Sequence, residues 1–274
     1  MIKPVRQFLN PLDATYITFY GKENMNNYNK VSNTRVIRPV WDRTTRCFHW
    51  INVLCVFVLS AIGTAILYED NLGFSNEGII LLKTVHVYTG YVFTINLLWR
   101  LGWAFFGNVH ARWRAILPFR SGYILELCTY VKDFRSGTPP TYLGHNPLAR
   151  LMVTLLLMLM LMQASSGLIL AGTDLYKPPF GGAIAKWVTN GDAERLAQLK
   201  PGSKDFVDLV AYKEMRTFRK PVKKTHEIGF YLLLIAILIH IVGVIITEIQ
   251  LKQGLISGMF TGHKVLPESP KNKD

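Results

Sequence analysis

The sequence predicts an all-α membrane protein, a four-transmembrane-helix bundle. Of its 274 residues 50% are hydrophobic, and the mean hydropathy of +0.20 is positive. The apolar residues gather in four blocks with few charges inside, and each block reaches the ~20 residues that a helix needs to cross a bilayer. The predicted helices span about residues 47–67, 79–106, 148–171 and 226–249.

These four helices define one membrane domain, residues 39–264, without a separate soluble domain. A polar arm, residues 1–38, precedes the domain. It is rich in Asn, Tyr and Lys and lacks clear periodicity, so we expect a loosely ordered cytoplasmic segment. We expect residues 265–274 to form a disordered C-terminal tail.

The formal net charge of +13 is carried mostly by segments that flank the apolar blocks. This placement is typical of membrane proteins, and no basic-aromatic motif is present, so the predicted partner is the lipid bilayer and not nucleic acid. Eight Lys or Arg precede Cys47, whereas the connection between the first two helices has only Lys83, at its edge. The positive-inside rule therefore predicts that both termini are cytoplasmic. The external connection, residues 172–224, carries eleven Lys or Arg, but long connections follow this rule poorly.

The first two predicted helices each carry one histidine near one end. His49 lies just inside the cytoplasmic end of the first helix, with Gly63 fourteen residues later on the same face. The second helix starts outside, so His86 lies near the outer surface and Arg100, fourteen residues later, near the inner one. The third helix has no histidine, and we expect its methionines to pack or to face lipid.

The fourth predicted helix carries two histidines, His226 and His240. Fourteen residues separate them by ~21 Å along the axis and bring both within ~40° of one direction. An ionisable ring among apolar residues is costly in a bilayer and indicates a function. By depth, His86 pairs with His226 at the outer level, and His49 pairs with His240 at the inner level.

Two histidine pairs at two depths predict two haem groups in the core of the bundle, each bound by one pair. No C-x-x-C-H motif is present, so the haems are expected to be b-type, without covalent attachment. A single membrane histidine can instead hydrogen-bond between helices. Zinc would need three or four ligands at one level, and a proton relay would favour acidic residues, which the spans lack.

Small and basic residues near the histidines are candidates for contacts with the haems. The glycines would leave room for flat macrocycles, and the basic residues would bind propionates. The glycines are Gly63, Gly90 and Gly229; the inner basic residues are Arg46 and Arg100; the outer ones are Lys83, Lys223 and Lys224. For each basic residue, snorkelling at a helix end is the alternative.

Helical patterning also occurs in the connections, at residues 123–134, 193–199 and 205–218. The last two lie in the external connection, which is long enough to indicate a function and would cover the outer haem. We expect this connection to meet an external redox partner.

Several motifs resemble the bacterial di-haem cytochrome b family: WDRTTRCFHW, the run from KTVHVYTG to LLWRLGWAFFG, GHNPLAR, LISGMFTGHK and the final histidine pair. That family includes membrane subunits of nickel–iron hydrogenases and formate dehydrogenases, and stand-alone cytochromes b. The resemblance covers roughly residues 38–264 and implies haem b ligation by His49, His86, His226 and His240. It also implies a place in the bacterial inner membrane and electron transfer between a periplasmic redox protein and the quinone pool.

Two departures from the family leave the partner open, because the N-terminal arm is longer than usual and the external connection is expanded. The partner would be a periplasmic dehydrogenase, a hydrogenase or a c-type cytochrome, and the chain an electron-transfer subunit rather than a self-sufficient enzyme. The alternative is a stand-alone quinone oxidoreductase for a small external redox species such as superoxide, since a basic outer surface would steer an anion. A haem-free transporter ranks third, because the chain lacks inverted repeats and broken helices.

Overall fold

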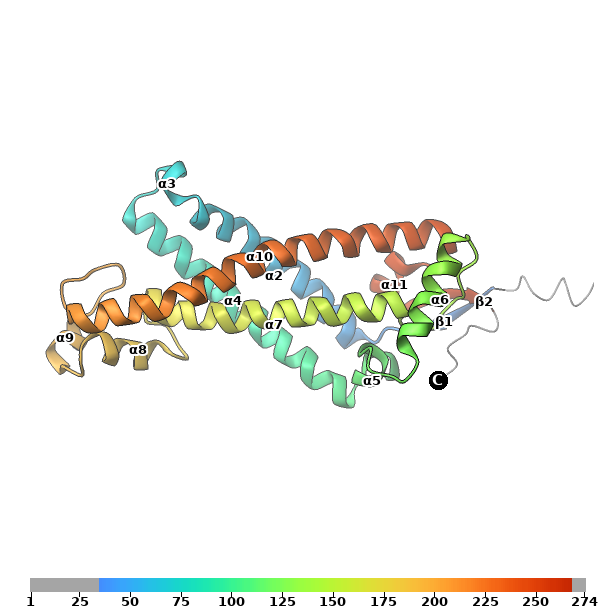
Figure 1. Cartoon of the computed structure of the whole chain (residues 1–274), viewed down its shortest axis with the longest axis horizontal. Coiled ribbons are helices and arrows are strands. Elements are labelled where there is room, and N and C mark those ends of the chain that lie inside the picture. Colours follow the sequence, from blue (N-terminus) through green and yellow to red (C-terminus); the bar gives the residue numbers. More distant parts are fainter. Residues whose placement is uncertain (1–34, 268–274) are drawn as a thin grey trace, which may run out of the picture.

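Four long helices dominate the computed structural model, which describes residues 35–267 (Figure 1). They are α2 (Arg43–Leu67), α4 (Asn76–Phe106), α7 (Pro147–Leu175) and α10 (Leu209–Leu251). All four are long and apolar enough to cross a membrane, which confirms the predicted four-helix membrane bundle. The shorter elements are β1 (Arg35–Pro39), α3 (Glu69–Leu72), η1 (Val109–Ala111), α5 (Trp113–Ile116), α6 (Tyr123–Arg135), α8 (Gly181–Val188), α9 (Ala193–Gln198), α11 (Leu255–Thr261) and β2 (His263–Pro267).

The long helices pack as two pairs. α2 lies against α4, α7 lies against α10, and contacts between α4 and α7 join the pairs. In Figure 1, α7 and α10 run alongside each other while α2 and α4 cross them obliquely. Within residues 35–267, α10 makes no comparable contact with α2 or α4, although these helices carry the histidines predicted to pair with its own. Directly packed helices have axes only ~8–10 Å apart, so this arrangement suits a flat group held between the partners.

Capping side chains explain where the long helices begin. The caps are Asp42 for α2, Ser75 for α4, Asn146 for α7 and Asp208 for α10. Each side-chain oxygen accepts a hydrogen bond from a backbone N–H that a helix start leaves unpaired. Asp42 also accepts from the indole Nε1 of Trp103 at 3.0 Å, which ties the start of α2 to the end of α4.

α10 begins well before the predicted fourth helix, at Leu209 instead of residue 226. The assignment of residues 172–224 to a connection is therefore wrong for residues 209–224, which form an extension of α10 outside the apolar span. One face of this extension is buried at Ala211 and Met215. Hydropathy does not reveal such a helix, because only one face is apolar.

The extension of α10 is supported by the short helices α8 and α9. Ile184 and Val188 of α8 pack with Val207 and Met215 in one buried apolar cluster. The helical patterning predicted at residues 193–199 and 205–218 corresponds to α9 and to the first turns of α10. The patterning predicted at residues 123–134 corresponds to α6.

A two-stranded antiparallel sheet lies at the opposite end of the bundle (Figure 1). In this sheet Arg35 of β1 is opposite Pro267 of β2, and Pro39 is opposite His263. The sheet corrects two boundaries, since residues 35–38 belong to a strand and not to a loosely ordered arm, and residues 265–267 belong to a strand and not to a disordered tail. Neither β1 nor β2 could be predicted from its own residues, because each strand depends on pairing with a segment that is distant in the sequence. The rest of the predicted arm, 1–34, and of the tail, 268–274, lies outside the described residues.

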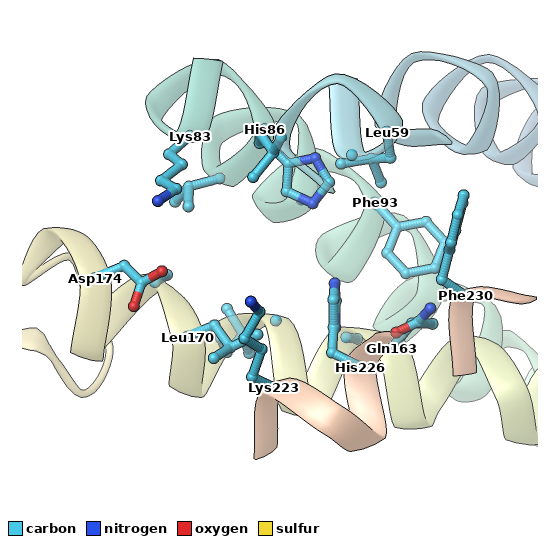
Figure 2. A pocket seen from close by; sticks show the side chains of 18 of the residues that line it. Leu59, Lys83, His86, Phe93, Gln163, Leu170, Asp174, Lys223, His226 and Phe230 are labelled. Atoms are coloured by element: carbon cyan, nitrogen blue, oxygen red, sulfur yellow. The ribbon is translucent and has the colours of Figure 1, made fainter. Parts of the chain in front are cut away.

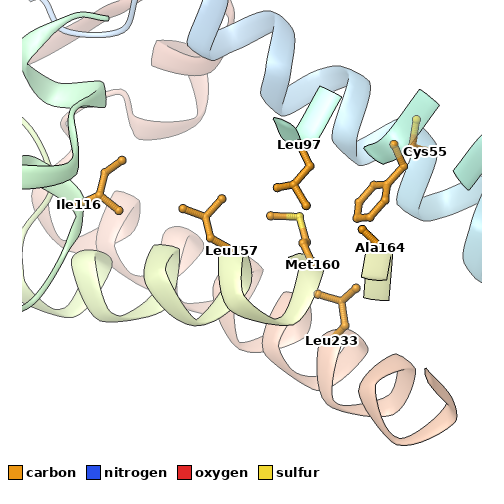
Figure 3. Close-up of a cluster of buried hydrophobic side chains, with 8 residues drawn as sticks. Cys55, Leu97, Ile116, Leu157, Met160, Ala164 and Leu233 are labelled. Carbon is orange, nitrogen blue, oxygen red and sulfur yellow. The ribbon is translucent and has the colours of Figure 1, made fainter. Parts of the chain in front are cut away.

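A cluster of buried apolar side chains from all four long helices and α5 fills the middle of the bundle (Figure 3). The cluster comprises Cys55, Phe93, Leu97, Ile116, Leu157, Met160, Ala164 and Leu233. Leu233 lies seven residues from both His226 and His240, ~10 Å along the helix from each. Phe93 likewise lies seven residues after His86. The cluster therefore separates the two histidine levels.

Candidate functional site

His86 of α4 and His226 of α10 face each other across a cavity (Figure 2). The cavity lies towards the end of the bundle that carries α8 and α9, which we name the outer end after the predicted orientation. The two imidazole centroids are 6.3 Å apart, with an angle of 76° between the ring planes. A metal–nitrogen bond to imidazole is ~2.0 Å long, and the ring centroid lies ~1.1 Å beyond the nitrogen. Two histidines that bind one metal ion from opposite sides therefore have ring centroids ~6.2 Å apart. The observed separation therefore fits one metal ion held between the rings.

A serine on α7 orients the His226 ring. Ser166 Oγ lies 2.9 Å from His226 Nδ1 and 2.7 Å from the carbonyl oxygen of Met162. The hydroxyl has one hydrogen, which it donates to the carbonyl, so Nδ1–H of His226 donates to Oγ. This tautomer leaves the lone pair of Nε2 for a metal. His86 differs, because its Nδ1 is buried and has no hydrogen-bond partner among the described residues.

Two glycines let the helix backbones approach the paired rings. A Cβ atom added at Gly63 of α2 would lie 3.3 Å from Cε1 of His86, and one at Gly167 of α7 would lie 3.3 Å from Cε1 of His226. Gly90 also lines the cavity, with open space where its side chain would be. Gly229, by contrast, faces Met162 and Gln163 of α7. Its expected role beside a haem is therefore corrected to close packing of α10 on α7.

The cavity between the rings has about 1420 Å³ of atom-free space, part of it open to the surface. A planar cofactor held between the two rings would lie in this space. Apolar side chains such as Leu59, Phe93 and Phe230 form its walls. These walls, two imidazoles from facing helices and a charged rim together suit a haem.

The rim of the cavity carries three cations, each beside an acid. Lys83 Nζ lies 3.8 Å from Glu69, and Lys223 Nζ lies 3.3 Å from Glu227. Arg219 of α10 forms a two-pronged ion pair with Asp174 of α7, whose Nη2 to Oδ2 distance is 2.6 Å. Figure 2 shows Lys83, Asp174 and Lys223 together on one side of the histidine pair. Of the outer lysines predicted to bind propionates, Lys83 and Lys223 lie at the rim, whereas Lys224 does not line the cavity.

The second pair, His49 of α2 and His240 of α10, lies at the other level. His240 is close enough to His49 to act on it electrostatically. Arg100, 5% exposed, donates to the carbonyl oxygen of Ala111 at 3.1 Å. Arg46 donates to the carbonyl oxygen of Phe260 in α11. Both arginines thus lie near the inner level, as predicted, but both are bound to backbone carbonyls.

Two further histidines, His110 and His145, lie against the Trp41 ring in a polar cluster beside the sheet. Lys264 of β2 donates to the carbonyl oxygens of Leu143 and Gly144 at 3.1 and 2.9 Å, and its ammonium lies 5.3 Å from the Trp41 ring. Burial lowers the pKa of Lys264 to about 8, and burial together with the charge of Lys264 lowers the pKa of His145 to about 3. At neutral pH the cluster therefore keeps a protonated lysine and a neutral imidazole.

Ser166 and Gly167 are the site residues that sequence reasoning missed. They lie on α7, the helix without a histidine, so a search for ligands passes over them. The available signal is the run from Ala164 to Gly167, four small residues in a helix otherwise rich in Leu and Met. Small residues in a membrane helix mark close approach of a neighbouring group.

The chain is similar to known proteins over most of its length. A family model described as prokaryotic cytochrome b561 matches residues 40–262. The chain is 25% identical over 239 residues to a probable Ni/Fe-hydrogenase B-type cytochrome subunit of Rhizobium leguminosarum bv. viciae, covering 84% of this chain and 89% of that protein. It is also 25% identical over 236 residues to the corresponding protein of Cupriavidus necator, covering 84% and 87%.

A shorter similarity reaches higher identity. The chain is 33% identical over 129 residues to a probable Ni/Fe-hydrogenase 1 B-type cytochrome subunit of Escherichia coli strain K12, covering 43% of this chain and 54% of that protein. The family match, however, extends over most of the chain and includes all four long helices. The protein therefore belongs to the prokaryotic cytochrome b561 family and is a membrane b-type cytochrome that functions in electron transfer.

Proposed function

We propose that this cytochrome binds two haem b groups at two depths and carries electrons across the membrane between an external redox protein and the quinone pool. The observation that carries the proposal is the His86–His226 pair, whose rings lie 6.3 Å apart across a cavity with apolar walls and a charged rim. His240 lies fourteen residues after His226 on the same face of α10 and acts electrostatically on His49 of α2.

A bound haem supplies a centre that accepts and releases one electron. The residues of this chain hold, orient and insulate that centre. His86 and His226 would hold the haem from both sides, and ligation by two histidines would favour electron transfer over oxygen binding. The apolar walls exclude water, and Phe93 and Leu233 fill the space between the two levels.

The relatives from R. leguminosarum and C. necator are named as hydrogenase subunits, which supports a hydrogenase as the external partner. A periplasmic dehydrogenase or a c-type cytochrome would meet the same outer end. Quinone would react near the inner level, between α2, α4 and α10. Such a protein lies in the bacterial inner membrane with both termini cytoplasmic, and the position of β1 and β2 at one end of the bundle supports that both lie on the same side of the membrane.

The proposal is tested by purification in mild detergent after expression with a haem supply. We expect two b-type haems per chain in a haemochrome assay, a reduced-minus-oxidised spectrum typical of b-type cytochromes, and reduction of the haems by added quinol in nanodiscs. A haem-free preparation would contradict the proposal. A hydrogenase in the same chromatographic peak would favour that partner over the other two.

Replacement of Ser166 by alanine is expected to raise the reduction potential of the outer haem. The hydrogen bond from His226 Nδ1 to Ser166 makes the imidazole a stronger donor, which favours the oxidised iron, and alanine removes this bond. A hydrogen bond worth ~1 kcal/mol corresponds to a shift on the order of 40 mV for one electron. Spectroelectrochemical titration measures the potentials of both haems.

Ser165 provides the matched control. Its hydroxyl donates to the carbonyl oxygen of Leu161 at 2.8 Å and is exposed, so Ser165→Ala removes an equivalent hydroxyl that does not touch a histidine. The control is expected to leave both potentials unchanged. Equal shifts in the two variants would show that the Ser166 hydroxyl does not tune His226.

A further inference from the structure

The extension of α10 has one exposed face that is strongly basic. Lys213, Arg216, Lys220 and Lys224 are all exposed and follow each other at spacings of three, four and four residues. Helical geometry places them within an arc of ~80° and along ~16 Å of the axis. We name these four residues the basic stripe. The opposite face of the same turns is buried at Ala211 and Met215, so the stripe faces away from α8.

No carboxylate neutralises the basic stripe among residues 35–267, where none of its four cations forms an ion pair. Two other cations of the same helix differ, because Arg219 pairs with Asp174 and Lys223 pairs with Glu227. Like charges three or four residues apart on a helix repel one another. The stripe therefore carries an unfavourable interaction that an anionic partner would relieve.

Lipid headgroups reach only one end of the basic stripe. Lys224 lies two residues before His226, at the start of the apolar span, whereas Lys213 lies ~16 Å further along the helix. The headgroup region on one side of a bilayer is only ~5–8 Å thick. Positive charge on the outer side also runs against the usual charge bias of membrane proteins. The stripe thus points to a partner that stands outside the membrane.

We propose that the basic stripe is the docking surface for a redox protein that presents an acidic patch around its electron-exit site. This inference rests on the proposed function, because it gives the chemistry of the external partner. The stripe leads directly to His226, so a partner bound along it would be held next to the outer histidine pair. Complementary charge steers encounter and fixes orientation, and both effects weaken as salt is added.

The test uses the full chain in phosphatidylcholine nanodiscs and two probes of opposite charge: native cytochrome c, whose surface is basic, and succinylated cytochrome c, whose surface is acidic. The stripe variant carries Lys213→Glu, Arg216→Glu and Lys220→Glu. The control variant carries Lys186→Glu, Lys200→Glu and Lys204→Glu, exposed external lysines off the stripe, so both variants have the same net charge. Equilibrium binding and the stopped-flow rate of oxidation of the reduced chain are measured for each probe.

At low salt we expect the wild type and the control to bind and reduce the acidic probe about tenfold better than the stripe variant does. The stripe variant should instead favour the basic probe, and added salt should remove these differences. Equal losses in the stripe and control variants would overturn the proposal, since net charge alone would then explain the effect. Loss of the preference in nanodiscs with phosphatidylglycerol would also overturn it, because lipid would then be the partner of the stripe.

The two proposals fail in different ways. Binding is measurable without haem, so a haem-free chain that still prefers the acidic probe through the stripe would contradict the proposed function alone. A chain with two haems whose binding ignores the stripe charges would contradict the docking surface alone.

Discussion

Replacement of His240 by alanine is expected to reduce the haem content from two per chain to one. Under the proposed function His240 would be the α10 ligand of the inner haem, and its removal would leave that haem with His49 alone. The outer site keeps His86 and His226, with the hydrogen bond to Ser166 intact. A haemochrome assay gives the stoichiometry, and a redox titration should show the loss of one of two transitions.

His226→Ala provides the reciprocal experiment and should remove the other transition. His263→Ala is the matched control, because His263 is exposed and its ring contacts only the carbonyl oxygen of Thr261 at 3.0 Å. This control should keep both haems. Loss of both haems in either ligand variant, with the bundle still folded by circular dichroism, would show that the two levels are not independent sites.

Replacement of Gly167 by leucine is expected to abolish haem binding at the outer level although both ligands remain. Even a Cβ atom at this position would lie 3.3 Å from Cε1 of His226, which is already tighter than ordinary van der Waals contact. A leucine must displace the ring, and the separation of 6.3 Å between His86 and His226 would be lost. The haem content should fall from two to one, and the inner transition should remain in the redox titration.

Gly102→Leu is the control for this experiment. Gly102 lies in α4, is exposed, and has nothing within 4 Å of an added Cβ. This variant should bind both haems. Retention of the outer haem in Gly167→Leu would show that the His226 ring does not rest against α7 as described.

The sequence alone predicts where the four membrane helices lie and at which depth each of the four histidines lies, because both signals are local. Hydropathy marks a membrane helix within its own residues, and a spacing of fourteen residues places His226 and His240 on one face. The pairing at the outer level also followed from depth alone, and the structure brings His86 and His226 together as expected. Ligation itself stays a prediction until the variants are measured.

Features that depend on contact between distant segments were not predictable in this way. Ser166 and Gly167 act on a histidine of another helix, so no periodicity within α7 assigns them to it. Gly229 illustrates the converse error, because it lies close to His226 in the sequence as expected, but its neighbours are Met162 and Gln163 of α7. The start of α10 was misplaced because its buried face depends on α8, which packs there only in the folded chain.

The pairing of β1 with β2 has a consequence for how the protein is made. β1 leads into α2 and β2 follows α10, so this sheet ties together two helices that carry His49 and His240 but do not pack directly on each other. β1 leaves the ribosome early and has no partner strand until the last described residues have been synthesised. The first strand must therefore wait for the last one, so the sheet can fix the ends of α2 and α10 relative to each other only after α10 and β2 have been synthesised.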